Sequence, residues 1–181
     1  MNMEGKEALF RKAQPGDIPG VTFIYEHIHD EEEAGRVVIG WNRKIYPTEH
    51  TALEAFYKEE LFVLEDHGCI VATAKINQEQ VPEYANVSWE YDAPDEEIMV
   101  LHTLVVDPFK ARKGYGKQFI EFYEQYALEN DCKYLRIDTN ERNARARQMY
   151  AKLGYKEVGI VDCTFNGIEG VHLVCLEKYL G

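Results

Sequence analysis

The sequence contains no run of uncharged apolar residues that approaches the ~18 residues a membrane-spanning helix requires. Residues 1–10 alternate charged and polar side chains and include no apolar stretch of secretory length. The first absence excludes a helical membrane protein, and the second gives no indication of a secretory signal. We therefore expect a protein of the cytoplasm that has no membrane partner.

Cysteine is also scarce, and the four cysteines lie far apart in the sequence, at Cys69, Cys132, Cys163 and Cys175. Zinc sites and redox motifs bring cysteines together at short spacings, and no Cys-x-x-Cys pair is present. The sequence therefore implies no metal and no redox centre. We expect free thiols that are mostly buried.

Positive charge is in the minority, with 20 lysines and arginines against 32 acidic residues and a formal net charge of −12. A chain of this charge repels phosphate backbones and anionic membranes, so nucleic acid is not an expected partner. The same field favours the approach of a cationic molecule such as a polyamine or an aminated sugar. An acidic surface also serves solubility alone, and composition does not separate the two explanations.

The 181 residues are 45% hydrophobic and 29% charged, values typical of a globular protein. This length supports one compact domain with a substantial core. No internal repeat, low-complexity tract or Pro/Gly/Ser linker divides the sequence. We therefore expect a single domain over residues 1–181.

Hydrophobic periodicity predicts about seven strands and about four helices in a mixed α/β order. The strands are expected at 9–13, 61–65, 70–76, 98–106, 134–139, 157–163 and 171–178. The helices are expected at 17–34, from Thr48 or Thr51 onward, at 115–130 and at 143–153. The strand-helix-strand order between 98 and 139 implies a parallel pair with a right-handed crossover.

Local signals predict several of the connections. Asp66-His67-Gly68 and Asn166-Gly167 favour tight hairpin turns. Thr51 and Glu54 have the spacing of a capping box for the second helix. The apolar side of that helix is expected to consist of Leu53, Phe56 and Tyr57.

The segment from 104 to 117 is the first that indicates chemistry. An apolar strand ends at Asp107-Pro108 and leads through a basic, glycine-containing stretch into an amphipathic helix. Unpaired N–H groups and the dipole at a helix start attract anions, and glycines let an anion approach the backbone. The stretch concentrates positive charge in an acidic chain, at Lys110, Arg112, Lys113 and Lys117. It therefore predicts a phosphate site.

Gly114-x-Gly116 alone is weak evidence, because an ordinary loop with a solvated basic face has the same pattern. The Rossmann and P-loop alternatives fail on spacing, since neither of their glycine patterns is present. Further support comes from Asn143, Ala146, Tyr150, Gly154 and Tyr155, which match the pattern Asn-x-x-Ala-x-x-x-Tyr-x-x-x-Gly-Phe/Tyr. Together the two segments resemble the GNAT acyltransferase superfamily.

The resemblance covers residues 101–155 and, with the final hairpin, the C-terminal half; the N-terminal half agrees only in element order. At the loop's first signature position, usually Gln or Arg, stands Ala111. The resemblance implies acetyl-coenzyme A (acetyl-CoA) as co-substrate and a GNAT-like fold in which the fourth and fifth strands splay apart. The residues it places against acetyl-CoA are Leu104, Val105, Val106, Arg112, Lys113, Gly114, Tyr115, Gly116, Lys117, Asn143 and Tyr150.

The resemblance also implies that Tyr150 acts as general acid, giving its proton to the departing thiolate of CoA. Tyr150 shares a helical stripe with Ala146, Met149 and Leu153, so packing in the core is the alternative. Asn143 is expected to contact CoA or a water beside it, and equally to cap the helix.

An ammonium acceptor must lose a proton before it attacks, which requires a base or a water path. His102 interrupts an apolar strand and is the candidate, although such a histidine is often a hydrogen-bonded core residue. The further candidates for the base are Glu26, His29 and Glu97. Trp41, Tyr46 and the loop 84–91 are candidates for the acceptor pocket.

The sequence thus predicts an N-acetyltransferase that moves acetyl from acetyl-CoA to the primary amine of a small, cationic molecule by direct attack. A non-catalytic acyl-CoA sensor and an interaction protein with a vestigial glycine loop are the alternatives. The acceptor, the acyl chain length and a possible homodimer stay open.

Overall fold

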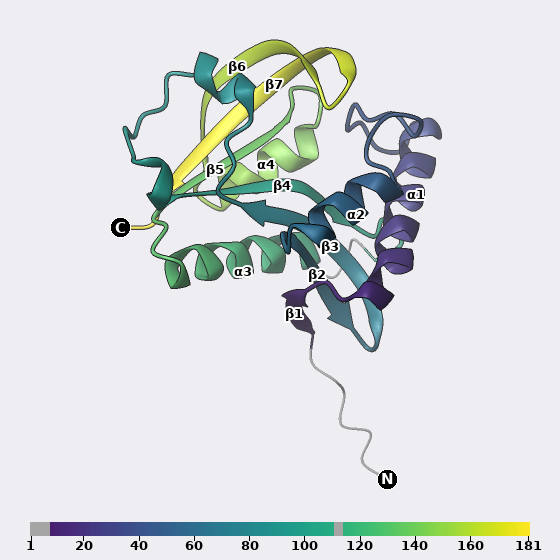
Figure 1. Ribbon diagram of the computed structural model, residues 1–181. Helices are drawn as coiled ribbons and strands as arrows, with labels where there is room; N and C mark the ends of the chain where they lie inside the picture. Colours follow the sequence, from purple (N-terminus) through teal and green to yellow (C-terminus); the bar gives the residue numbers. More distant parts are fainter. Residues whose placement is uncertain (1–7, 111–113) are drawn as a thin grey trace.

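The computed structural model describes residues 8–110 and 114–181. Within them, seven strands form one sheet in the order β1-β2-β3-β4-β5-β7-β6 (Figure 1). The strands are β1 (Leu9–Lys12), β2 (Leu61–Asp66), β3 (Cys69–Asn77), β4 (Ile98–Val106), β5 (Tyr134–Asn140), β6 (Lys156–Phe165) and β7 (Ile168–Tyr179). Neighbours are antiparallel, except that β4 and β5 are parallel.

Four α-helices flank this sheet: α1 (Ile18–Glu33), α2 (Glu49–Tyr57), α3 (Tyr115–Glu129) and α4 (Ala144–Lys152). Three short 3-10 helices, η1 (Pro15–Asp17), η2 (Pro82–Asn86) and η3 (Asp95–Glu97), lie in the connections. Every expected strand and helix is present, so the predicted mixed α/β fold with a parallel pair is confirmed. None of the described helices is long and apolar enough to cross a membrane.

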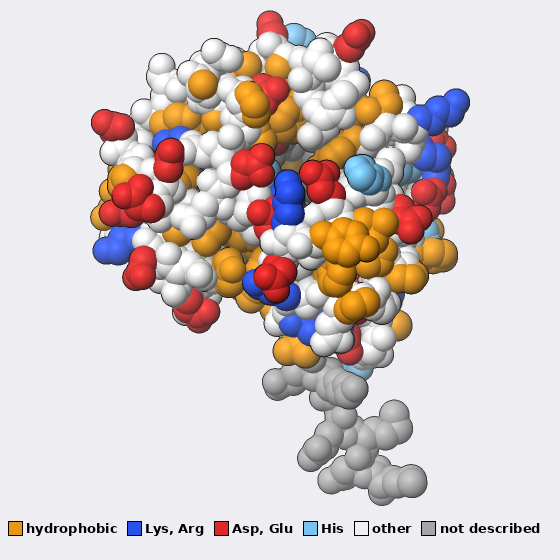
Figure 2. Space-filling model, viewed as in Figure 1, with side chains coloured by type: hydrophobic (Ala, Val, Ile, Leu, Met, Phe, Trp, Pro, Cys, Tyr) orange, Lys and Arg blue, Asp and Glu red, His pale blue; other side chains and the backbone are white. Residues whose placement is uncertain are grey.

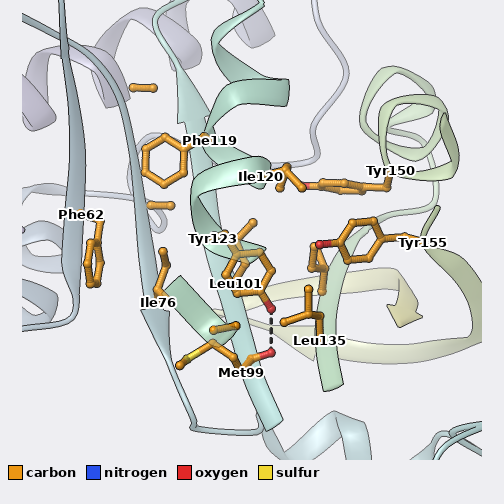
Figure 3. Close-up of a cluster of buried hydrophobic side chains, with 14 of the residues drawn as sticks. Phe62, Ile76, Met99, Leu101, Phe119, Ile120, Tyr123, Leu135, Tyr150 and Tyr155 are labelled. Carbon is orange, nitrogen blue, oxygen red and sulfur yellow. Dashed lines mark hydrogen bonds between the residues drawn. The ribbon is translucent and has the colours of Figure 1, made fainter. Parts of the chain in front are cut away.

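The helices cover the two faces of the sheet in pairs. Helix α3 lies on one face, where its residues Phe119, Ile120 and Tyr123 pack against β2 to β5 and against Tyr150 of α4 (Figure 3). The Tyr123 hydroxyl donates a hydrogen bond of 2.6 Å to the carbonyl of Met99, which satisfies the one polar group of that ring (Figure 3). Helices α1 and α2 cover residues of β2 and β4 on the opposite face.

The hairpin turns have the predicted conformation. Asn166 and Gly167 have positive φ angles of 51° and 78°, and Phe165 pairs with Ile168 across them. His67 and Gly68 repeat this arrangement between β2 and β3. Two consecutive left-handed residues match the twist of the flanking strands, which explains why Asn-Gly forms such a turn.

For the second helix, the predicted capping box is wrong and the predicted apolar side is only partly correct. Its N-cap is Thr48, whose backbone N–H donates to Thr51 Oγ1 at 2.9 Å, so Thr51 and Glu54 do not form the capping box. Leu53 and Phe56 of the predicted apolar side are partly buried and pack against the core, as expected. Tyr57 does not, since it is 77% exposed, and the fully buried residues of the helix are Ala52 and Ala55.

All four cysteines are free thiols. Cys132 and Cys175 are buried, Cys163 is partly buried and Cys69 is exposed. Burial raises the pKa of Cys175 to about 12, so this thiol stays protonated and inert at neutral pH.

Candidate active site

The parallel pair of strands opens halfway along its length. Residues of β4 and β5 pair from Ile98 with Tyr134 to Leu101 with Ile137, and from residue 102 onward β4 pairs only with β3. Beyond this point the two strands diverge, as expected for a splayed pair. One side of 102–106 is therefore left without a strand partner.

A bulge in β4 accompanies this divergence. Thr73 of β3 opposes Val105 and Lys75 opposes His102, so that Thr103 and Leu104 together face a single residue, Ala74. Thr103 has a positive φ of 52°, which is rare for a β-branched residue. The hydroxyls of Thr103 and Tyr46 share a hydrogen bond that holds the bulge against the loop before α2. Bulges bend a strand and re-aim its side chains, and this one lies where the strands part.

A cavity of about 900 Å³ occupies the opening. Its lining includes the end of β4, the start of α3, the start of α4 and the loop that contains Tyr46. Figure 2 shows the molecular surface hollowed near the middle of one face, with acidic and basic side chains around the hollow. A cavity of this size accommodates a ligand much larger than a metabolite amine alone.

The start of α3 is one end of this cavity. Gly114 precedes the helix with a left-handed φ of 72°, a conformation that glycine adopts without strain. The first bond of the helix runs from Gln118 N–H to the Gly114 carbonyl, so the three N–H groups before it have no partner within α3. Together with the helix dipole these donors form an anion site, and Gly114, Gly116 and Lys117 line the cavity beside them.

Gly116 also has a packing role that was not predicted from the sequence. A Cβ atom at this position would lie 3.1 Å from Met149 Sδ and 3.8 Å from Val106 Cγ2. The glycine therefore permits the close approach of α3 to α4, and it contributes to an anion site only through its backbone.

The predicted co-substrate residues lie around the cavity with specific exceptions. Leu104, Val105, Val106, Asn143 and Tyr150 line it together with the glycines and Lys117. Tyr115 does not, because its ring is 3% exposed in the core and its hydroxyl donates to Asp66 Oδ2. For Tyr115 only the backbone N–H is left to serve a ligand. Arg112 and Lys113 lie outside the described residues.

Tyr150 is buried but not isolated. Its ring packs against Tyr155 at 5.9 Å between centroids, at one edge of the core cluster (Figure 3). Its hydroxyl has no hydrogen-bond partner among the described residues. The only completely buried polar side-chain atom without a partner in these residues is Arg136 Nε, so the hydroxyl must be accessible. The Tyr150 hydroxyl is therefore open to the cavity. Burial, and secondly the charge of Asp138, raises the pKa of this phenol, so it stays protonated.

Asn143 caps the helix that carries Tyr150. Its Oδ1 accepts a hydrogen bond of 3.1 Å from Ala146 N–H, as an N-cap side chain does. Gly154 closes the other end of α4 with a φ of 90°. The helix is thus fixed at both ends, and Tyr150 is held at a defined place in the cavity wall.

His102 lines the cavity, but its surroundings make it a weak base. Its Nε2 lies 2.7 Å from Asn77 Oδ1, and the Asn77 amide donates to Glu60 Oε2 at 3.0 Å. Since Asn77 Oδ1 can only accept, Nε2 carries the proton. Burial, followed by the charge of Lys75, lowers the pKa of His102 to about 3. The imidazole is neutral at physiological pH and has little tendency to take up a second proton.

The three further candidates for the base lie away from the cavity. Glu26 is on the outer side of α1 in an ion pair with Arg43. The buried His29 bonds the Pro47 carbonyl at 2.8 Å, and Glu97 belongs to η3. None of the three lines the cavity.

Two of the residues predicted for an acceptor pocket lie in the cavity wall. Trp41 and Tyr46 line the cavity, and their rings are 6.1 Å apart. The loop 84–91 does not line it, because Tyr84 is 2% exposed beneath the wall and Trp89 packs on Tyr84 and Arg136. The preceding residues Val81, Pro82 and Glu83 take that place.

Asp138, a carboxylate in the cavity wall, was not predicted from the sequence. It follows Ile137, the last residue of β5 that pairs with β4, so it is the first residue of the opening. Its Oδ2 accepts a hydrogen bond of 2.7 Å from the Tyr84 hydroxyl. The signal available in the sequence was an acidic residue within an apolar strand, directly after the position at which a splayed pair separates.

Comparison with known proteins places this geometry in a family. The model of the acetyltransferase (GNAT) family matches residues 22–155, a range that contains β4, α3, β5 and α4. The N-acetyltransferase YhfO of Bacillus subtilis is 31% identical over 110 residues, 58% of this chain and 68% of that protein. The streptothricin acetyltransferase of Escherichia coli is 34% identical over 97 residues, 53% of this chain and 51% of that protein.

The fold has a counterpart among solved structures. A protein from Salmonella typhimurium, described as an acetyltransferase with its cofactor acetyl-CoA, superimposes with a TM-score of 0.71. The match covers 97% of this chain and 95% of that protein at 15% identity, and it shows that the fold is shared. Because the family model spans most of the chain, including both segments that line the cavity, this protein belongs to the acetyltransferase (GNAT) family.

Proposed function

We propose that the protein transfers the acetyl group of acetyl-CoA directly to the primary amine of a small, cationic molecule. The observation that carries this proposal is the single cavity that connects the anion site at the start of α3 with the open hydroxyl of Tyr150. A pyrophosphate and a thioester at the two ends of one extended ligand require such a connection. Family membership supports the reaction class.

The described residues fit acetyl-CoA in charge and in backbone chemistry. The free N–H groups of α3 and the ammonium of Lys117 suit the pyrophosphate, and Arg142 and Arg145 add positive charge beside α4. The unpaired side of 104–106 suits the pantetheine amides, because a ligand that completes missing backbone hydrogen bonds is held firmly. When bound, acetyl-CoA supplies an activated thioester.

Tyr150 serves as the general acid in this proposal. Its hydroxyl faces the cavity and its raised pKa keeps the proton in place until a strong base, a departing thiolate, forms beside it. Asn143 positions Tyr150 by capping α4. Backbone N–H groups of the β4 bulge are suited to stabilise a carbonyl oxygen that becomes negative.

The acceptor side favours a cation. Glu54, Glu79, Glu83 and Asp138 line the cavity, together with the aromatic rings of Trp41 and Tyr46. Carboxylates and aromatic faces both attract an ammonium group, and the net charge of −12 adds a long-range attraction. Lys75 and Lys58 also line the cavity, so the attraction is local and depends on where the ammonium lies.

A thiol-release assay tests the proposal. The protein is mixed with acetyl-CoA and a panel of polyamines, aminated sugars, amino acids and peptides, and free CoA thiol is measured. We expect turnover with at least one cationic small amine and none with neutral analogues that lack the amine. Calorimetric binding of acetyl-CoA without thiol release across the panel would instead indicate a non-catalytic acyl-CoA sensor. Absence of binding at millimolar acetyl-CoA would contradict both.

Tyr150→Phe tests the assignment of the general acid. We expect kcat to fall by about 100-fold or more, because general acid-base catalysis contributes that much, while acetyl-CoA affinity stays within threefold. The matched control is Tyr155→Phe, which removes a hydroxyl bonded to Glu124 rather than open to the cavity. Equal turnover in Tyr150→Phe and the unaltered protein would remove Tyr150 from the chemistry.

A further inference from the structure

The cavity passes through the sheet from one face to the other. Tyr150 packs with Leu101 and Ile137 on the face covered by α3. Tyr84 packs with Ile98 and Val100 on the opposite face. Successive side chains of a strand point to opposite faces, so Asp138, which bonds Tyr84, follows Ile137 onto the second face. Tyr150 and Asp138 therefore reach the same opening from opposite sides of the sheet.

Asp138 has one satisfied and one available oxygen. Its Oδ2 accepts from the Tyr84 hydroxyl, and no described residue donates to Oδ1. In the described part of the chain, the only side-chain nitrogen or oxygen that is both completely buried and unpaired is Arg136 Nε. Since Asp138 Oδ1 is unpaired, it cannot be completely buried, and it is therefore open to the cavity that Asp138 lines. Among the described residues Asp138 forms no ion pair, and the charge that acts most on it is the like charge of Glu83.

We propose that Asp138 is the general base of the reaction: its free oxygen receives the acceptor's ammonium group and removes a proton from it, and Tyr84 positions the carboxylate. This inference rests on the proposed acetyl transfer and assigns its acceptor side. A cationic amine entering from the second face meets Asp138 before it reaches the donor side at Tyr150.

The protons balance as follows. The ammonium gives one proton to Asp138, and the resulting neutral amine forms a C–N bond with the thioester carbonyl. The C–S bond breaks, and the thiolate takes the proton of Tyr150. The nitrogen of the new amide loses its second proton, which restores Tyr150 by way of solvent. Asp138 releases its proton to solvent, so one proton is released for each amide and free thiol formed.

The surroundings of Asp138 suit a base that works near neutral pH. Burial, opposed by the Tyr84 hydrogen bond and reinforced by Glu83, raises the pKa of Asp138 to about 6. The other titratable groups around it are Tyr46 on the loop before α2, Tyr150 on α4, Cys163 on β6 and Cys175 on β7. All four are neutral at pH 7, since the pKa of each is raised. An aspartate in this place is ionised at neutral pH and still accepts a proton readily.

His102 is the competing base, and the two assignments predict different pH profiles. If Asp138 is the base, kcat/KM falls as the pH drops through about 6. If His102 is the base, the fall lies near its pKa of about 3. A pH profile therefore distinguishes the two groups without any substitution.

The experiment measures thiol release from acetyl-CoA with the best amine of the panel, between pH 5 and 9, for the unaltered protein and four variants, namely Asp138→Asn, Tyr84→Phe, His102→Asn and the control Asp162→Asn. Asp138→Asn is expected to lower kcat/KM by about 100-fold or more and to abolish the acid limb. Tyr84→Phe is expected to move the limb to higher pH, because the lost hydrogen bond favoured the charged carboxylate. The control, Asp162→Asn, replaces a carboxylate on β6 that is 80% exposed. It is expected to change neither kcat/KM nor the position of the acid limb.

Thermal unfolding supplies a readout that does not need activity. The raised pKa means that the ionised carboxylate costs stability as the pH rises from about 4 to about 6. Asp138→Asn is therefore expected to unfold at a higher temperature than the unaltered protein at pH 7 and at the same temperature at pH 4. A residue that only supported the fold would lower the unfolding temperature when replaced.

Two results would overturn the assignment of Asp138 as the base. Turnover by Asp138→Asn equal to that of the unaltered protein would do so, as would an acid limb that persists in Asp138→Asn and disappears in His102→Asn. A limb unmoved by Tyr84→Phe would remove the positioning role of Tyr84. If the unaltered protein releases no thiol with any amine, both the proposed acetyl transfer and the assignment of Asp138 are wrong. If the unaltered protein is active but the variants do not behave as expected, only the assignment of Asp138 is wrong.

Discussion

Two glycines of the anion site are required for different reasons. Gly114 has a left-handed backbone, and a Cβ atom there would meet no other atom within 4 Å. Gly116 has an ordinary backbone, but its Cβ would press on Met149. The conformation is thus the constraint at the first position, and helix packing is the constraint at the second.

Gly114→Ala is expected to destabilise the protein by about 1 kcal/mol and to weaken acetyl-CoA binding several-fold. The alanine must either adopt a strained left-handed conformation or shift the first turn of α3, whose N–H groups form the anion site. Thermal unfolding and calorimetric titration with CoA measure the two effects. The control is Gly16→Ala, where a Cβ also has open space but φ is not positive. Equal losses in both variants would show that conformation at Gly114 is unimportant.

At the residue scale the sequence predicted the cavity wall better than its chemistry. Tyr150 and Asn143 belong to one local motif with a fixed spacing, so both could be named in advance. The basicity of His102 depends on Asn77 and Lys75, which join it only when β3 pairs with β4. Asp138 bonds Tyr84, which lies 54 residues earlier in the chain, and the proposed role of Asp138 depends on this contact. Periodicity contains no information about such partners.

At the scale of elements, helix α4 connects the fold to the chemistry. It is only 9 residues long, and isolated helices of that length are marginal in water, so its position depends on its ends and on packing. Asn143 caps one end, and Leu153 and Gly154 close the other. A change at the cap is therefore expected to affect Tyr150 without touching it.

Substitutions of Asn143 separate capping from ligand contact. Asn143→Ala is expected to lower stability by about 1 kcal/mol and to reduce kcat, because α4 loses its cap. Asn143→Asp keeps a capping oxygen and is expected to restore stability. If Asn143 also contacts CoA, the added negative charge weakens acetyl-CoA binding in Asn143→Asp. Unfolding temperature and CoA affinity, measured for both variants, distinguish the two roles. No loss of stability in Asn143→Ala would contradict the capping role.

Element types and order followed from the sequence because strand and helix periods differ and the hairpin turns have distinctive residues. The face that α2 presents did not follow. Its larger apolar residues suggested a side that includes Tyr57, whereas the structure buries Ala52 and Ala55 most deeply, packs Leu53 and Phe56 beside them and exposes Tyr57. Which side of a short helix is buried depends on how closely it must approach its neighbours, and the period alone does not specify that distance. The separation of β4 and β5 was likewise expected only through the family resemblance.

At the scale of the whole molecule, the proposed mechanism uses both faces of the sheet. Helices α3 and α4 bring the helix N-terminus and Tyr150 to one side, whereas β5 places Asp138, η2 places Glu83 and the loop before α2 places Tyr46 at the other. The opening between β4 and β5 is the only place where they meet in this arrangement of the described strands. We therefore propose that donor and acceptor enter this opening from opposite faces of the sheet.

A crystal structure of the protein soaked with acetyl-CoA tests this account most directly. We expect the pyrophosphate at the N-terminus of α3, the pantetheine along 104–106 and the sulfur within hydrogen-bond distance of the Tyr150 hydroxyl. We also expect a path from the thioester through the sheet to Asp138. A structure in which side chains of the protein fill the opening, or in which acetyl-CoA binds with its sulfur away from Tyr150, would contradict it.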